Sequence, residues 1–572
     1  MRGRRIIAYS GKAPKEGSFV PHRHRRPSTA TTPFTLSRTA RRPHLAAFGL
    51  LTVLALVLAL SLSSCSGEPS AAERGPIAVH RAPQADLVLP AADAEGAIAA
   101  SAALFVSAHV AVLSGPDSVE QAGELAQSLG VPVFLVENAE AQPEAQGARE
   151  GDQHPGAPAA GNALAAEFER LGVQHTLLVG TAKPAWLSGE AEEYPPAAGQ
   201  GASQPAESAQ PAGTAQPTQT GPTHLTPADI HYLPATTTAP FPAITDGANP
   251  ATLATVRAAG GAVVESHPDP RASSATIQAL AGSAAAVASF GVDLPDLSWQ
   301  VAAARSGTEL PGGGQLVLEG KRYVALYGSP VTAALGVLGE QGVEETAARA
   351  DAHAQPYRAL TEDTVIPAME LIVTVAAGQP GDDGNYSHEW DPDIFVPYIE
   401  AAARHGQYVV LDFQPGRSSF PEQVKRYEKL LRYPNVGIAL DPEWRLGPED
   451  FPLERIGHVE IAEVNETVRW LADFVRENQL PQKVVILHQF QVQMLRDVDQ
   501  LDQSRAEVAL VIHADGQGSQ PAKQDTWRTL HSHAPAGVAW GWKNFYDEDK
   551  PMLTPEETYT QVEPTPAFVS YQ

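Results

Sequence analysis

The sequence contains a single cysteine, Cys65, among 572 residues. No disulfide can form within one copy of the chain, so this residue has no structural partner of its own kind. Aromatic residues make up only 7% of the chain, but hydrophobic residues as a whole make up 43%, which is enough for sizeable cores. A chain of this length predicts two or more domains.

Basic residues are scarce and unevenly placed. The chain has 40 Lys and Arg against 66 Asp and Glu, and eleven of the basic residues fall within residues 1–64, which hold one acidic residue. The remaining residues hold 29 basic and 65 acidic side chains, a net charge of −36. So acidic a surface argues against nucleic acid as the partner of the mature protein, and suits solubility at an anionic cell surface.

The sequence also lacks two kinds of ligand-binding motif, one for dinucleotides and one for metal ions. The glycine-rich turns lack the spacing of a dinucleotide site, so no nucleotide cofactor is expected. The sequence has no HExxH motif and no paired HxH at the end of a strand. We therefore expect no cofactor and assign no set of metal ligands.

The first part of the chain has the pattern of a secretory signal. Leu45–Leu62 is a nearly uninterrupted apolar run that follows three arginines within residues 38–42. It ends in Leu62-Ser63-Ser64-Cys65, which resembles the lipobox of bacterial lipoproteins. This resemblance implies a signal peptide over residues 1–64, a lipidated Cys65, and anchoring at the outer face of the cytoplasmic membrane. A single-pass signal anchor is the alternative, because the run is about long enough to span a bilayer.

Residues 65–84 are small, polar and proline-containing, and are expected to be a tether. A first α/β domain is expected over residues 85–310, because apolar strand patterns at 109–113, 131–136 and 176–179 alternate with helical ones. This order predicts a parallel sheet of the Rossmann or flavodoxin-like kind. Residues 188–240 are rich in Ala, Pro, Gln, Ser, Thr and Gly, which indicates a disordered insertion.

Within the first domain, HVAVLSG, VPVFLVE and ALAAEFERLGVQHTLLVG follow one another. In this order they resemble the second type of cell-wall-binding repeat, found in secreted proteins of Gram-positive bacteria. The resemblance covers about residues 87–181. It implies binding to a cell-wall polymer.

A second domain is expected over residues 315–572, where apolar strands each run into polar residues. The seven strands expected are 323–327, 369–375, 408–413, 436–440, 484–487, 508–512 and 538–540. The helices expected between them are 331–350, 393–405, 421–431, 461–477, 491–501 and 523–531. Seven such units predict a TIM-type (β/α) barrel. The tail after Lys550 either supplies an eighth strand or leaves the barrel incomplete, and an open doubly wound sheet is the alternative fold.

In either fold the carboxyl ends of these strands converge on one face, where we expect the functional site. The candidate catalytic residues are Glu443, Asp441 and Asp412. The candidate substrate-binding residues are Trp444, Arg417, His488, Gln489, His513, Asp515, Trp540, Trp542 and Lys543.

Several long motifs in this half resemble a family of secreted or lipid-anchored actinobacterial proteins without an established activity. They are ALYGSP, PGDDGNYSHE, VVLDFQPGR, LDPEWRLGP, LPQKVVILHQF, VIHADG and GWKNFYDED. The resemblance implies an envelope location and a barrel. In addition, GIALDPEW resembles the fourth-strand signature of chitinase-like glycoside hydrolases, but has Ala439 where an acid belongs and Pro442 between the two carboxylates.

The chemistry that fits this face best is glycan hydrolysis, which needs two carboxyl groups flanking the sugar. We expect Glu443 to be the general acid, with Asp441 or Asp412 tuning its pKa or acting as the base. Metal-dependent hydrolysis by His488, His513 and Asp515, with Asp412 or Asp441, is the second possibility. The third is binding of cell-wall polysaccharide or peptidoglycan without catalysis.

Overall fold

The computed structural model describes residues 75–136, 160–181, 183–184, 186–187, 190–193 and 230–572. The expected signal peptide, Cys65 and residues 194–229 of the expected insertion lie outside these ranges. Among the described residues, no helix combines the length and the apolar character that a membrane crossing requires.

The N-terminal region contains two four-stranded parallel sheets where the sequence predicted one. The strand orders are β5-β4-β6-β7 and β2-β10-β8-β9, and β1 pairs with β3 in a separate antiparallel pair. The strands are β1 Ala78–His80, β2 Leu87–Val88, β3 Phe105–Ala108, β4 Val110–Ser114, β5 Val133–Leu135, β6 His175–Val179, β7 Glu190–Glu193, β8 Phe241–Thr245, β9 Gly261–Glu265 and β10 Val287–Ser289. The helices are α2 Asp93–Leu104, α3 Val119–Leu129, α4 Ala160–Leu171, α5 Pro250–Ala258, α6 Ser274–Leu280 and α7 Leu297–Arg305.

This arrangement does not confirm a single Rossmann-like or flavodoxin-like domain. Strand β1 lies within the segment expected to be a tether, and Ile77 and Ala78 are fully buried there. Strand β7 lies within the segment expected to be an insertion, and pairs with β6. Both short strands were missed because composition alone does not reveal a pairing partner.

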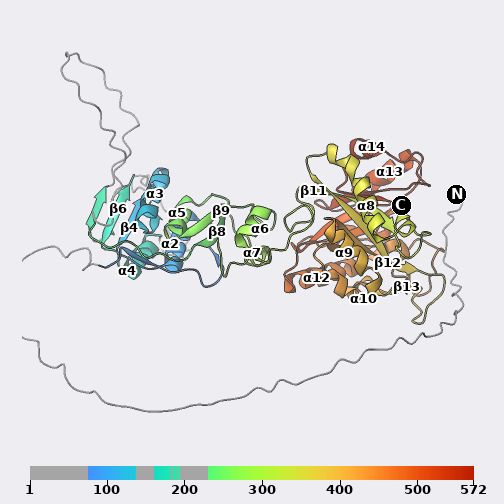
Figure 1. Cartoon of the computed structure of the whole chain (residues 1–572), viewed down its shortest axis with the longest axis horizontal. Helices are drawn as coiled ribbons and strands as arrows, with labels where there is room; N and C mark the ends of the chain where they lie inside the picture. The colour runs from blue at the N-terminus through green and yellow to red at the C-terminus, as the bar shows by residue number, and fades with distance from the viewer. Residues whose placement is uncertain (1–74, 137–159, 182, 185, 188–189, 194–229) are drawn as a thin grey trace, which may run out of the picture. The chain divides into compact units, whose positions relative to one another are not determined.

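The C-terminal region is a closed barrel of eight parallel strands (Figure 1). The strands are β11 Lys321–Gly328, β12 Thr364–Ala376, β14 Tyr408–Phe413, β15 Val436–Leu440, β17 Lys483–Gln489, β19 Val508–Ala514, β20 Ala539–Asn544 and β21 Phe568–Tyr571. Strand β21 pairs with both β20 and β11, so the tail after Lys550 supplies the eighth strand and the open-sheet alternative is wrong. A short strand, β13 Ser387–Glu389, is added antiparallel to the end of β12.

The barrel helices mostly match the expected ones. They are α8 Val343–Ala354, α9 Val396–Arg404, α10 Phe420–Arg426, α11 Glu428–Leu431, α12 Ile461–Glu477, α13 Gln520–His531 and α14 Pro555–Gln561. The expected helix 491–501 is wrong, because two short 3₁₀ turns flank a two-residue strand there. Four of its five apolar residues, at 492, 495, 498 and 501, recur every three positions, which is the repeat of a 3₁₀ helix.

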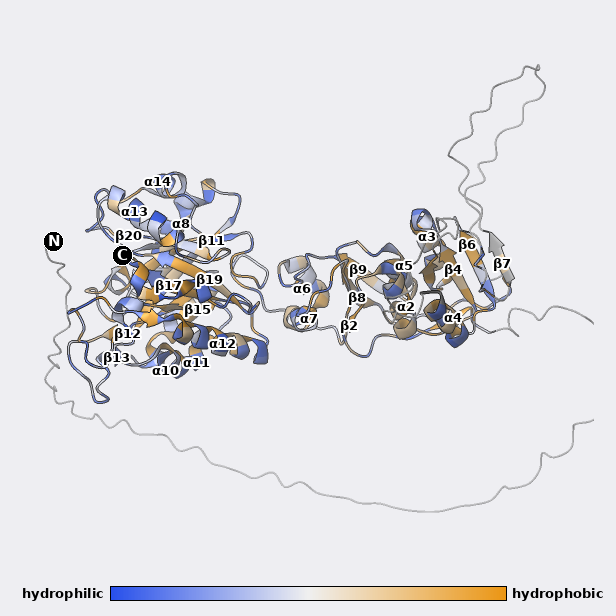
Figure 2. Ribbon diagram, turned by 180° about the vertical axis from the view of Figure 1, so that it is seen from behind, coloured by the Kyte–Doolittle hydropathy of each residue, from blue (hydrophilic) through white to orange (hydrophobic). Residues whose placement is uncertain are grey.

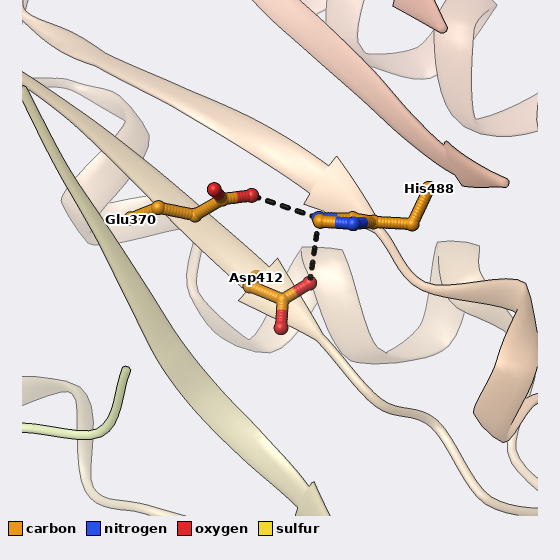
Figure 3. A group of neighbouring side chains, drawn as sticks. All are labelled: Glu370, Asp412 and His488. Carbon is orange, nitrogen blue, oxygen red and sulfur yellow. Dashed lines mark hydrogen bonds and ion pairs between the residues drawn. The ribbon is translucent and has the colours of Figure 1, made fainter. Parts of the chain in front are cut away.

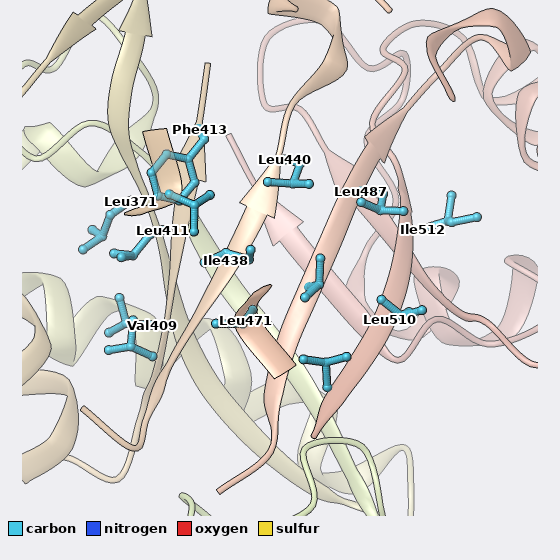
Figure 4. Close-up of a cluster of buried hydrophobic side chains, with 14 of the residues drawn as sticks. Leu371, Val409, Leu411, Phe413, Ile438, Leu440, Leu471, Leu487, Leu510 and Ile512 are labelled. Atoms are coloured by element: carbon cyan, nitrogen blue, oxygen red, sulfur yellow. The ribbon is translucent and has the colours of Figure 1, made fainter. Parts of the chain in front are cut away.

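Strand alternation divides the barrel core into two layers. Outward residues such as Leu411, Leu440 and Leu487 pack against the helices (Figure 4), and inward residues such as Val410, Ala439 and Ile486 fill the barrel interior. In Figure 2 the apolar colours follow the barrel strands, whereas helix α13 is largely hydrophilic. Fully burying each of the leucine, isoleucine and valine side chains contributes about 1.5–3 kcal/mol, so the two layers fix which residues can face the barrel axis.

Candidate functional site

The same alternation turns one polar side chain inward near the carboxyl end of every barrel strand. The inward residues of β14 are Tyr408, Val410 and then Asp412, and those of β17 are Val484, Ile486 and then His488. We call the resulting set the polar ring. It consists of Tyr327 on β11, Glu370 on β12, Asp412 on β14, Asp441 directly after β15, His488 on β17, His513 on β19, Lys543 on β20 and Ser570 on β21.

A chain of hydrogen bonds crosses the polar ring through His488. Its Nε2 lies 2.8 Å from Oε1 of Glu370, and its Nδ1 lies 3.1 Å from Oδ2 of Asp515, which follows β19. Burial opposes a charge on the imidazole, but the Glu370 carboxylate and the bonds to Asp515 and Glu370 raise the pKa of His488 well above its usual value. His488 is therefore held as a cation between two carboxylates.

Asp412 lies near the same imidazole nitrogen of His488 as Glu370. Its Oδ2 accepts a 3.0 Å hydrogen bond from the hydroxyl of Tyr327, and its Oδ1 lies 3.8 Å from Nε2 of His488 (Figure 3). Burial raises the pKa of Asp412 to about 6, although the charge of His488 works against this rise. The ammonium of Lys543 lies 3.3 Å from the centre of the Tyr327 ring, a cation–π contact that keeps a second positive charge in the ring.

Asp441 and Glu443 sit on the loop after β15. The Oδ1 of Asp441 accepts a hydrogen bond of 3.1 Å from the backbone N–H of Glu443 and so caps the 3₁₀ turn Pro442–Trp444. Burial, together with the nearby carboxylates of Asp412 and Asp515, raises the pKa of Asp441 well above its usual value. Glu443 and Trp444 are half-buried at this loop, so they are more accessible than Asp441.

His513 is neutral within the ring. Its Nε2 lies 3.1 Å from the hydroxyl of Ser570. Burial, with the positive charges of His488 and Lys543 nearby, lowers its pKa well below the usual value. The ring thus places a neutral imidazole beside a charged one.

Of the residues singled out from the sequence, the polar ring and its margin bring together Asp412, Asp441, His488, His513, Asp515 and Lys543. Arg417 lies in the loop after β14, with its guanidinium 4.4 Å from the ring of Tyr386 and 4.9 Å from that of Phe451. It also donates to the carbonyl of Asp450. Arg417 is therefore a rim residue rather than a member of the ring.

Trp540, Trp542 and Gln489 do not face the ring. Trp540 and Trp542 pack on Trp527 of α13, with ring centres 5.4 and 5.6 Å apart, because they alternate with the inward Lys543. The side-chain amide of Gln489 holds the following loop by donating to the carbonyls of Gln491 and Val492. The two tryptophans thus pack against α13, and Gln489 hydrogen-bonds to the loop that follows β17.

Sequence reasoning missed Glu370, Tyr327 and Ser570. A signal for Glu370 was present, since it is the one charged residue in the apolar strand Met369–Val375, two positions after the inward Ala368. A carboxylate at an inward position of a parallel strand is costly unless it is paired, which marks the position as a site. Tyr327 and Ser570 offer no such signal, because neither places a charge in an apolar strand.

Comparisons with known proteins give no family. No family model matches the chain, and no curated protein resembles it in sequence. Solved structures that resemble its fold include a D-psicose 3-epimerase determined with D-fructose, at 10% identity and a TM-score of 0.25, covering 44% of this chain and 84% of the other. A GH5-4 broad-specificity endoglucanase from Clostridium longisporum matches at 12% identity and a TM-score of 0.25, covering 43% and 80%.

A hyperthermophilic endo-β-1,4-glucanase determined with substrate matches at 9% identity and a TM-score of 0.21, covering 36% of this chain and 76% of the other. The distant neighbours are thus glycosidase and epimerase barrels. Similarity at this level concerns the barrel fold, and nothing about activity follows from it.

Proposed function

We propose that the chain is a lipid-anchored protein of the bacterial cell envelope whose barrel acts on envelope glycan as a glycoside hydrolase-like enzyme. The observation that supports catalysis is the polar ring, to which each of the eight strands contributes a side chain. Barrels of this type place their active sites at the carboxyl ends of the strands. Buried charged groups rarely add stability over apolar ones, so their concentration at this face favours a functional role.

In the proposed reaction, Glu443 protonates the leaving-group oxygen. It is more accessible than Asp441 on the loop after β15, and Asp441 holds its turn through the 3.1 Å hydrogen bond to its backbone N–H. Asp441 is then a positioning residue, and Asp412 is the partner carboxylate on the neighbouring strand. This division follows the need of glycosidases for two carboxyl groups with different environments.

The choice of glycan is supported by aromatic side chains at the same face. Trp444 is half-buried, and Tyr386 and the 40% exposed Phe451 flank the guanidinium of Arg417. Aromatic faces with a few fixed polar groups form the kind of surface that binds sugar rings. Lipid anchoring is proposed from the signal sequence and from Cys65.

The test is release of reducing ends from purified cell-wall polymers by the full-length protein. We expect Glu443→Gln to reduce the initial rate by at least about 100-fold, because the proton donor is lost. Glu466→Gln makes the same chemical change at an exposed position on α12 and is expected to leave the rate unchanged. Equal rates in the wild type and Glu443→Gln would contradict the role of Glu443.

One observation favours a second function, binding of wall polymer without cleavage. Asp412 is 0% and Asp441 is 3% exposed, so a substrate reaches them only if the surrounding loops move. In that case the wild type would sediment with insoluble cell wall and release no reducing ends. Release that depends on Glu443 would exclude this function.

A further inference from the structure

Three side chains of the polar ring converge on one point inside the barrel mouth. Glu370, Asp412 and His488 each offer one ligand atom, and these three atoms lie within 4.8 Å of one another (Figure 3). Separations of 2.8 and 3.8 Å join the imidazole nitrogen to the two carboxylate oxygens. The inward residue that pairs in register with Asp412 on β15 is Ala439, whose side chain is only a methyl group.

Each of the two carboxylates has one oxygen that lacks a hydrogen-bond partner. Oε2 of Glu370 and Oδ1 of Asp412 are buried and accept no hydrogen bond within the described part of the chain, and both residues are 0% exposed. Leaving one buried polar atom unpaired costs about 1–3 kcal/mol, and more when the group is charged. Two carboxylates with unmet oxygens therefore leave acceptor capacity beside His488, and a metal ion bound here would displace the proton from its Nε2.

Two neighbouring side chains, Asp515 and Tyr327, hold His488 and Asp412 in the way that supporting residues hold metal ligands. Asp515 lies 3.1 Å from Nδ1 of His488, which fixes that nitrogen as a donor and directs Nε2 at the carboxylates. Tyr327 donates to Oδ2 of Asp412 and leaves Oδ1 facing the histidine. A carboxylate behind a ligating histidine, and a hydrogen bond to the far oxygen of a ligating carboxylate, are the usual supports of metal ligands.

We propose that Glu370, Asp412 and His488 form a binding site for one divalent transition-metal cation, Mn²⁺ or Zn²⁺. A donor set of two carboxylates and one imidazole suits these ions better than Ca²⁺ or Mg²⁺, which prefer oxygen ligands alone. Three protein ligands leave coordination positions open for water or substrate, as catalytic sites require. Such an ion lowers the pKa of bound water and would supply the nucleophile of a hydrolysis.

The catalytic meaning of this site rests on the proposed function, but cation binding is measured without any substrate. Full-length protein is stripped with a chelator and titrated with Mn²⁺ and with Zn²⁺ by calorimetry, and its melting temperature is followed in parallel. We expect one equivalent to bind and the melting temperature to rise, since the ion binds only the folded state. No heat of binding and an unchanged melting temperature with both ions would overturn the proposal.

Variants assign the binding to these residues. Glu370→Gln and Asp412→Asn each keep the shape of the side chain, and we expect each to weaken binding by at least about 100-fold. Asp515→Asn removes only a supporting group and should weaken it by about 10- to 100-fold. Glu466→Gln, exposed on α12, should bind like the wild type. Wild-type affinity in both ligand variants would place the ion elsewhere and refute the site.

If a variant fails to fold, the visible absorption spectrum of the wild type loaded with Co²⁺ tests which ligand atoms hold the ion. A weak spectrum without thiolate bands, lost on adding Zn²⁺, supports a site of oxygen and nitrogen ligands, and an absent spectrum counts against it. The two proposals fail separately. Metal binding without release of reducing ends overturns the glycosidase function alone, whereas release that is unaffected by the chelator, with no metal bound, overturns the metal site alone.

Discussion

Lys483 provides a test of the fold that depends on a single buried charge. It begins β17, is 0% exposed, and donates through Nζ to the carbonyls of Tyr433 at 2.9 Å and Val436 at 2.7 Å. Burial lowers its pKa from 10.5 to about 7. At 1.36 kcal/mol per pKa unit, this change corresponds to at most about 5 kcal/mol.

The sign of the effect follows from proton binding in the two states. Between pH 7 and 10.5 the unfolded chain holds a proton on this amine that the folded chain lacks, so the free energy of unfolding rises with pH. Below pH 7 both states are protonated and the full cost of burying the charge is present. Between about pH 6 and about pH 9.5, this residue alone should add about 3 kcal/mol to the free energy of unfolding.

The variant Lys483→Met removes the titration. It also removes two hydrogen bonds, which costs about 1–3 kcal/mol at every pH. The stability of the wild type relative to this variant should therefore increase by about 3 kcal/mol from about pH 6 to about pH 9.5.

Urea unfolding followed by tryptophan fluorescence measures this difference, because six of the eight tryptophans lie beyond residue 320. Lys425→Met, at an exposed lysine on α10, is the matched control and should show no such increase. A difference between the wild type and Lys483→Met that stays constant with pH, or falls as pH rises, would refute the reasoning.

Other predictions concern the core, the mouth and the anchor. Leu471→Ala, which empties a fully buried position on α12, should lower the free energy of unfolding by about 2–5 kcal/mol in urea titrations, and a loss below about 1 kcal/mol would contradict the packing. Gly416→Ala should lower activity without removing a ring side chain, because Gly416 has φ +60° and an added Cβ would collide with the carbonyl of Asn385. Cys65→Ser should move the protein from the membrane fraction to the soluble fraction on cell fractionation, and continued membrane association would favour a signal anchor.

The carboxyl ends of seven barrel strands can be predicted from the sequence. The direction of each side chain follows only when the alternation of residues between the two faces of a strand is applied. From the sequence, Trp540, Trp542 and Lys543 are assigned together to the substrate-binding face. In a strand, however, residues two apart share a face and adjacent residues point to opposite faces. Since Lys543 faces the barrel axis, both tryptophans must face the helices. The two-residue repeat of a strand separates the tryptophans from Lys543. The same repeat places Glu370 on the inward face, two residues after Ala368.

The contacts within the polar ring could not be derived in this way. Glu370 and His488 are 118 residues apart, and their hydrogen bond depends on the register of the strands between them. Register follows from the packing of the whole barrel rather than from any local pattern. The 3₁₀ turns at 492–494 and 498–500 were mistaken for a helix for a related reason, since spacings of three and 3.6 residues are hard to distinguish over ten residues.

The closure of the barrel by β21 has a consequence for how the protein is made. Strand β21 fills the space between β20 and β11, which are separated by about two hundred residues of sequence. Until Phe568–Tyr571 have been synthesised, β11 and β20 each present an edge of unpaired backbone groups to any neighbouring chain. The barrel is therefore protected from edge-to-edge association only after its last strand has paired with β20 and β11.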